Sequence, residues 1–418
     1  MKVPSSPTVS ERPPLDPTFP DPETPSSTQI RYLPLTPVGG WYWLLGKQER
    51  AVPQLTPANE RPSFRGAHWR RLRRFGRGVM LWVLFWFVAF QMAATFFKDR
   101  WHKIGPHYEL QKWPALERLV AEEPERPLLL MIGSSRTSCA FQASALDGMP
   151  DSDGRPMLVY NFGIPSTGPC FQLFCLRDLL AKGIRPRFLL IECLPLMWSD
   201  PQRGVVSEDS LLAFESLPLR RMLQWIPYLQ NPRKGATLWV QARITPCYTF
   251  RNYIVSELTS LAGGDPKPKH VPIDNRGWHL TPAVIAPAIH EIFMAEAFAG
   301  YWPGLMNFRI GKTSYRAIHE LFDLCRREKI PSALVLMPED SRFRTWYSPK
   351  AKMAIRNLLD ELRQTYGVET IDARSWLSDY DFEDGHHALL GGALIFTRRI
   401  RAELPRLLAQ SSQTVKSD

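Results

Sequence analysis

Short apolar runs, separated by helical patterns, recur through the last three quarters of the chain. Five runs end in Gly, Pro or polar residues, and they cover residues 127–132, 157–162, 187–193, 333–337 and 368–371. Short runs without polar–apolar alternation are typical of parallel strands that are covered on both faces. The pattern therefore predicts five buried parallel strands.

Helical patterns lie between these runs. They cover residues 171–181, 315–328, 350–364 and 389–408. Strand–helix alternation predicts an α/β doubly wound sheet, and about five strands favour a flavodoxin-like order over a full dinucleotide-binding fold. Residues 200–305 break this rhythm, so we interpret them as an insertion between the third and fourth strands. Insertions at the carboxyl edge of such sheets commonly shape the ligand crevice.

A longer apolar run precedes the first strand. Residues 79–97 form 19 consecutive residues without a charge, with Gln91 as the one amide. At 1.5 Å per residue this run makes about 28 Å of helix, close to the roughly 30 Å of a bilayer core. A buried core helix rarely runs this long without a charge, and a cleaved signal peptide would start nearer residue 1. We predict one transmembrane helix over residues 78–97.

The net charge of +11 is concentrated beside that run. Residues 61–103 hold 10 Lys/Arg and one acid, whereas residues 104–418 hold 37 and 34. Six Arg lie in the 14 residues directly before the apolar run, at positions 65, 70, 71, 73, 74 and 77, whereas Lys98, Arg100 and Lys103 follow it closely and are offset by Asp99. The heavier side should stay cytoplasmic. This predicts a single-pass protein of the cell inner membrane, N-terminus inside, with an extracytoplasmic (periplasmic) C-terminal domain.

The same distribution decides between classes of partner. A basic patch on a folded domain would indicate nucleic acid, but here the excess flanks an apolar helix, so we expect no nucleic-acid binding. Anionic lipid headgroups are the expected partner of the Arg cluster. Six Cys are present without a CxxC motif or a Cys/His cluster, so no zinc site and no other cofactor is predicted. Buried free thiols are the simplest interpretation for most of the six Cys.

The remaining segments complete the domain plan. Residues 1–70 are predicted to be a disordered cytoplasmic tail, because residues 1–62 hold 13 of the 38 Pro. An apolar patch at residues 40–46 is either a loop or a contact with the membrane or a partner. Residues 104–126 form a connector with a helical pattern around residues 115–123, and residues 127–410 form the α/β domain.

Candidate chemistry begins where the first strand ends. Gly133-Ser134-Ser135 follows the strand directly, and ligands of α/β proteins bind at this edge of the sheet. The Gly permits a tight turn, and N–H groups at the start of the next helix can stabilise an oxyanion. A helix N-cap explains a Ser at this place equally well.

A second group of polar residues lies just before the closing helix. Asp384-Gly385-His386-His387 offers an acid and two imidazoles on one turn. A nucleophilic Ser needs a base, and the base needs an orienting acid, which these residues can supply. His386 is an alternative base, because its spacing from Asp384 is also reachable. A surface loop rich in Asp and His is the other interpretation.

Together the two blocks resemble the SGNH (GDSL-like) hydrolase superfamily. Residues 133–136 (GSSR), with the acidic-x-x-Pro segment at residues 192–195, resemble its membrane-anchored bacterial branch. The family carries its nucleophile in a Gly-Asp-Ser block near the domain start and its Asp and His in a D-x-x-H block near the end. Here Ser134 replaces the Asp of the first block, and Ser135 takes the position of the nucleophile. The resemblance implies His387 as general base and Asp384 as its orienting acid, because they match D-x-x-H.

The family's oxyanion hole is matched in part. Gly163 stands where the second block supplies a backbone donor, beside the Ser135 amide, whereas the third block, Gly-x-Asn-Asp, is replaced by Ile191-Glu192-Cys193-Leu194-Pro195. Asn161 is a possible substitute for the missing Asn. Further candidate pocket residues are Ser134, Arg136, Glu192 and His386. Arg136 would bind an anionic group or make a surface contact, and Glu192 would face the pocket or solvent.

The resemblance implies a serine esterase or O-acyltransferase. Its substrate would be a small ester or an acylated glycan of the cell envelope or of an exopolysaccharide, with acetyl as the expected acyl group. The departures from the family pattern keep a second hypothesis open. In it, the protein is a catalytically inactive SGNH-like module that binds glycans or scaffolds their assembly.

Overall fold

The computed structural model describes residues 65–100, 107–199, 217–229, 231–251 and 272–417, with residues 208, 255 and 259. Residues 70–418 cluster as one compact unit, separate from residues 1–69. The predicted tail, apart from its last six residues, and the apolar patch at residues 40–46 lie outside the described residues.

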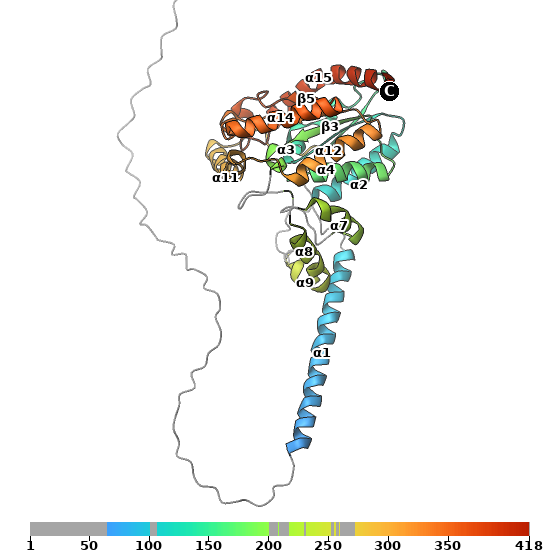
Figure 1. Ribbon diagram of the computed structural model, residues 1–418, viewed down its shortest axis with the longest axis vertical. Helices are drawn as coiled ribbons and strands as arrows, with labels where there is room; N and C mark the ends of the chain where they lie inside the picture. The colour runs from blue at the N-terminus through green and yellow to red at the C-terminus, as the bar shows by residue number, and fades with distance from the viewer. Residues whose placement is uncertain are drawn as a thin grey trace, which may run out of the picture. The chain divides into compact units, whose positions relative to one another are not determined.

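A five-stranded, fully parallel sheet forms the centre of the α/β body (Figure 1). The strands are β1 (Leu128–Gly133), β2 (Leu158–Gly163), β3 (Phe188–Cys193), β4 (Ser332–Leu336) and β5 (Glu369–Asp372). Each lies within one residue of a predicted run. Their order, β2-β1-β3-β4-β5, is the flavodoxin-like order, so the predicted fold class is confirmed at this level.

Alternate residues of the strands enter two separate cores, one on each face of the sheet. In β1, Leu128, Leu130 and Ile132 join one core, while Leu129 and Met131 join the other. Every residue of β1, β2 and β3 is buried. This two-sided burial explains why their sequences show no polar–apolar alternation.

Helices supply the other half of each core. The first core is filled by α2 (His107–Glu122), α4 (Pro169–Ala181), α12 (Lys312–Arg327) and α14 (Pro349–Tyr366). The second is closed mainly by α15 (Leu390–Ser417). The four predicted helical patterns of the domain correspond to α4, α12, α14 and α15. The helical pattern in the connector belongs to α2, which begins eight residues earlier than the pattern indicated.

The apolar run lies in one long helix, α1 (Arg65–Arg100). Its segment Arg73–Ala93 is long and apolar enough to cross a membrane, and none of that segment is buried in the protein. Among the described residues it is the one helix that meets these criteria. It overlaps the predicted span over residues 78–97.

The insertion between β3 and β4 is largely helical in its described parts. It contains α7 (Leu219–Trp225), α8 (Pro232–Ile244), α9 (Pro246–Thr249) and α11 (Pro287–Met306). It also contains the 3-10 turn at residues 226–228. Shorter helices outside the insertion are α3 (Ser135–Ala140), α5 (Pro195–Trp198) and α13 (Ser341–Thr345), and the 3-10 turns outside it are residues 143–146 and 379–381. Because α11 and the segment before it return to the carboxyl edge of the sheet, the insertion contributes to the site described next.

Candidate active site

The turn after β1 presents a single partly exposed serine. Ser134 caps α3, because its side chain accepts a hydrogen bond from the backbone N–H of Arg136 at 3.2 Å. Ser135 is the first residue of α3 and is partly exposed, whereas its neighbours on both sides are buried. The two serines therefore divide the two expected roles: Ser134 is the N-cap, and Ser135 carries an accessible hydroxyl.

A buried carboxylate stabilises the turn after β1 by hydrogen bonds. Glu192, at the end of β3, accepts hydrogen bonds from the Ser134 N–H at 2.6 Å, the Ser134 hydroxyl at 2.8 Å and the Thr137 hydroxyl at 2.6 Å. A Cβ at Gly133 would lie 2.3 Å from Glu192 Oε2, so this close approach requires glycine. Glu192 and Ser134 are at most 1% exposed, so their side chains do not face a solvent-accessible pocket; their hydrogen bonds fix the turn that carries Ser135.

Ser135, His387 and Asp384 form one hydrogen-bonded chain. The distance from Ser135 Oγ to His387 Nε2 is 2.7 Å, and from His387 Nδ1 to Asp384 Oδ2 it is 2.6 Å. Because an ionised carboxylate can only accept, Nδ1 carries the proton and Nε2 accepts from the serine hydroxyl. This is the tautomer that a general base acting on Ser135 requires.

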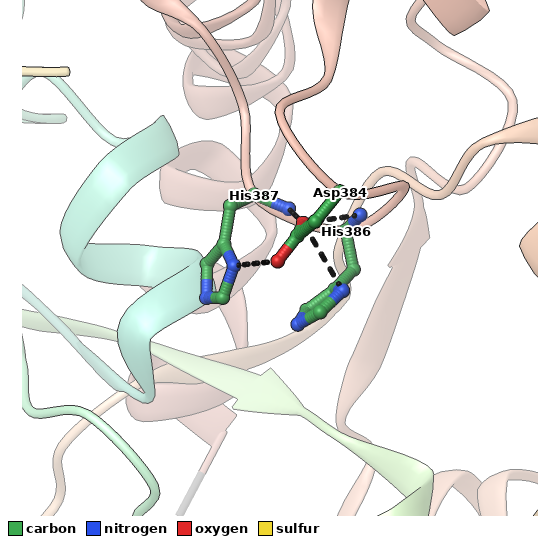
Figure 2. Close-up of side chains that lie close together, drawn as sticks. All are labelled: Asp384, His386 and His387. Atoms are coloured by element: carbon green, nitrogen blue, oxygen red, sulfur yellow. Dashed lines mark hydrogen bonds and ion pairs between the residues drawn. The ribbon is translucent and has the colours of Figure 1, made fainter. Parts of the chain in front are cut away.

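The loop before α15 sets this geometry through Asp384 (Figure 2). Its Oδ1 accepts from the backbone N–H groups of His386 and His387, at 3.1 and 2.8 Å, so its carboxylate spans the turn. Gly385 has a φ of +86°, a conformation that side chains other than glycine rarely adopt. Asp384 thus both folds the loop and orients the imidazole.

The charged forms of Asp384 and His387 stabilise each other. Burial acts to raise the pKa of Asp384, but the two neighbouring histidines outweigh this effect and hold it below its usual value. Burial likewise acts to lower the pKa of His387, and the Asp384 carboxylate reverses the direction and raises it. A charged Asp384 therefore stabilises the imidazolium that forms when His387 accepts a proton.

His386 occupies a different environment from its neighbour. Its ring packs against Tyr301 of α11 and Phe343 of α13, with centroid distances of 4.6 and 5.5 Å, and is 5% exposed. Its Nδ1 lies 3.2 Å from Asp384 Oδ1 without forming a hydrogen bond. Burial lowers its pKa to about 3. His386 is therefore a neutral packing residue, and the base position against Ser135 is held by His387.

Two of the three expected oxyanion donors, Gly163 and Asn161, are occupied. The Gly163 N–H donates to Asn161 Oδ1 at 2.9 Å, and Asn161 Nδ2 donates to the carbonyls of Thr137 and Phe141 at 2.9 and 2.6 Å. Asn161 is fully buried within β2. Both groups hold α3 against β2, so the oxyanion role expected for them does not fit their hydrogen bonds. The Ser135 N–H makes no hydrogen bond to the described residues and remains as a donor.

Arg136 is also buried instead of lining a pocket or the surface. It is 1% exposed, and its Nη2 donates to the Pro338 carbonyl at 2.9 Å and to Glu339 Oε1 at 3.2 Å. Its Nε and Nη1 have no hydrogen-bond partner among the described residues. The guanidinium therefore ties the serine turn to the segment after β4, and the expected anion-binding or surface role is not supported.

Two residues near the site were not identified from the sequence. Lys112 of α2 is fully buried, and its Nζ donates to the Gly163 carbonyl at 2.7 Å and reaches Ser138 Oγ at 3.3 Å. Burial lowers the pKa of Lys112 to about 7. His279 of the insertion donates its backbone N–H to the Ser138 carbonyl, and its Nδ1 lies 3.6 Å from Cys139 Sγ. Neither residue belongs to a recognisable motif.

A metal ion would compete with the hydrogen-bonded chain. Among the described residues, the one group of three ligand-type side chains is Asp384, His386 and His387, with ligand atoms within 4.8 Å of one another. Asp384 and His387 are already hydrogen-bonded to each other, and His387 is also hydrogen-bonded to Ser135. All six cysteines are free thiols, and five of them are buried.

Comparisons with known proteins leave the site to be interpreted from its own chemistry. No protein-family model matches the chain, and no curated protein matches it.

Proposed function

We propose that this protein is a membrane-anchored serine esterase or O-acyltransferase with an SGNH-like catalytic domain. The observation that carries the proposal is the chain from Ser135 through His387 to Asp384, with both hydrogen bonds at or below 2.7 Å. Its position at the carboxyl edge of a parallel sheet is where α/β enzymes bind substrates.

The reaction follows from these three residues. Ser135 Oγ attacks the ester carbonyl while His387 Nε2 takes the hydroxyl proton, and Asp384 stabilises the imidazolium. The Ser135 N–H donates to the oxyanion of the tetrahedral intermediate. The intermediate collapses when His387 returns the proton to the departing alkoxide, which leaves an acyl-serine. Water or a sugar hydroxyl then releases the acyl group by the same steps in reverse.

The proposed substrate class depends on the side of the membrane on which the α/β domain lies. We propose that α1 crosses the inner membrane with the Arg-rich side in the cytoplasm, so that the catalytic domain meets ester-linked acyl groups, with acetyl as the expected group, of envelope or exopolysaccharide glycans. The basic cluster before the span would contact anionic lipid headgroups.

One observation favours a second function. The amides expected to complete the oxyanion hole, Gly163 N–H and Asn161 Nδ2, are engaged internally, which leaves the Ser135 N–H as the identified donor. Loss of one oxyanion donor typically costs about 10²–10³ in rate. A non-catalytic SGNH-like module that binds glycans is therefore the alternative.

Labelling with a fluorophosphonate probe tests the choice. The full-length protein in nanodiscs should label, and Ser135→Ala should abolish the labelling, while Ser152→Ala, at an exposed serine outside the site, should label like the parent. Labelling that persists in Ser135→Ala would contradict the assignment of the nucleophile. A parent protein that neither labels nor releases acetate from acetylated glycan would favour the non-catalytic module.

A further inference from the structure

We propose that α7, α8 and α9, here called the interfacial helices, rest in the lipid headgroup region of the membrane that α1 crosses. The inference rests on the proposed membrane crossing by α1 and is independent of the chemistry at Ser135. It assigns a lipid-binding surface to part of the insertion between β3 and β4.

A direct contact sets the position of α9 along α1. The backbone N–H of Cys247 donates to Gln91 Oε1 at 3.2 Å, and Cys247 Sγ lies 3.6 Å from the Phe90 carbonyl. The ribbon accordingly has α9 beside α1 (Figure 1). Exposure along α1 agrees with this contact, because residues 73–88 are exposed whereas Ala89, Gln91 and Ala93 are partly covered. The insertion therefore reaches α1 at residues 89–93.

This contact lies at the depth of a membrane interface. Gln91 is six residues before the end of the apolar run at Phe97, which is about 9 Å at 1.5 Å per residue. It is two residues before the end of the segment Arg73–Ala93, which is about 3 Å. Helices that lie in the membrane interface bury their apolar face by about 5–10 Å. If α1 spans the bilayer, α9 lies within that layer.

The side chains of these helices suit such a position. Val240 and Ile244 of α8 lie four residues apart and are 46% and 61% exposed, and Tyr248 of α9 is 58% exposed. Leu219 and Leu223 of α7 share the same spacing and are 55% and 58% exposed. Residues four apart on a helix share a face. Large apolar residues on one helix face usually need a covering partner, and here the outer acyl chains would supply it.

The charge of the segment selects lipid headgroups as its partner. Residues 217–251 contain six basic residues and no acid, whereas the rest of residues 104–418 has more acids than bases. The six are Arg220, Arg221, Arg233, Lys234, Arg243 and Arg251. The Arg243 guanidinium lies 4.1 Å from the Trp239 ring centroid, and that of Arg251 lies 4.4 Å from the Tyr248 ring. Aromatic residues beside Arg are typical of the membrane–water interface.

Lipid-borne quenching tests the proposal on the full-length chain. A fluorescent non-canonical residue is placed singly at Ile244, at Trp86 in α1 or at Met353, which is 60% exposed on α14. Each protein is reconstituted in nanodiscs of phosphatidylcholine and phosphatidylglycerol, with and without nitroxide-bearing lipids. We expect the fluorescence at 86 and 244 to fall about two-fold and that at 353 to stay unchanged, because only the first two positions touch acyl chains.

The three positions separate the possible failures. Quenching at 86 without quenching at 244 would overturn the interfacial helices and leave the membrane crossing intact. Absence of quenching at 86 and 244 would overturn both. A residue at 244 that is shielded from lipid nitroxide and from aqueous iodide would indicate that a second copy of the chain covers the surface, and would overturn the lipid assignment. A residue at 240 serves as the repeat measurement if the label at 244 disturbs α8.

Discussion

The ends of β1 and β2 lie side by side in the sheet but differ in what they leave available. After β1, Ser135 has a partly exposed hydroxyl, a base at 2.7 Å and an uncommitted N–H. After β2, Gly163 has its N–H bonded to Asn161 and its carbonyl bonded to Lys112. The proton-transfer half of the site is thus assembled, while the half expected to bind the oxyanion serves to hold the backbone. Measurements that separate these two halves will decide between an enzyme and a binding module.

Removal of the base should have the largest effect. We expect His387→Ala to lower kcat for an acetyl ester by roughly 10⁵–10⁶, because a serine without its base is barely nucleophilic. His386→Phe keeps the packing against Tyr301 and should change kcat by less than about ten-fold, since His386 does not touch Ser135. Steady-state hydrolysis of a chromogenic acetate checks both variants. Equal losses in the two would refute the assignment of His387 as base.

The orienting acid should matter nearly as much. Asp384→Asn keeps the size of the side chain but permits the wrong tautomer of His387, so kcat should fall by about 10⁴. The measurement is single-turnover hydrolysis by protein whose fold is verified by circular dichroism. A loss smaller than about ten-fold would show that His387 is held by other groups.

Asn161→Ala tests the half of the site after β2. The substitution leaves the Phe141 carbonyl without its donor and the Gly163 N–H without its acceptor in the interior, so we expect the free energy of unfolding of the domain to fall by about 2–3 kcal/mol. If Asn161 instead binds the oxyanion, kcat should drop by about 10²–10³ while stability changes little. Thermal unfolding and kcat, measured on the same preparation, distinguish the two roles.

The smallest predicted effect is a displaced pH profile. Only neutral His387 can accept the serine proton, and its pKa is raised by Asp384. The rate should therefore fall as the pH decreases through that raised pKa, with a midpoint above the usual histidine value of about 6.5. His386 should add no limb in this range, since burial lowers its pKa to about 3. A kcat/KM profile whose midpoint lies below 6 would contradict a His387 pKa that is raised by Asp384.

The fold was predictable because buried parallel strands carry a strong local pattern. Each predicted run coincides with a strand to within one residue, since both faces of β1, β2 and β3 must be apolar. Ser135, Asp384 and His387 could be named because turns at strand ends and the spacing of D-x-x-H are visible in the sequence. The distances between these three side chains depend on tertiary structure and could not be predicted.

The buried polar contacts were not predictable from the sequence. Glu192 and Asn161 end or interrupt apolar strands, which indicates only that they are unusual. Whether such a side chain faces a ligand or a backbone amide depends on the neighbouring turn, here α3. Lys112 stands in a helix of mixed polarity, where one buried lysine looks like any exposed one. These three residues were missed or misassigned because most of their partners are between 20 and 58 residues away in sequence.

The position of Lys112 has a consequence for preparing soluble protein. Lys112 lies in α2, between α1 and the first strand, yet its Nζ donates a hydrogen bond to the Gly163 carbonyl inside the α/β body. A protein truncated just before β1 would lose this donor and the apolar contacts of Leu116 with the core. A soluble version that retains the site must therefore begin before His107, so part of the segment that looks like a tether belongs to the α/β domain.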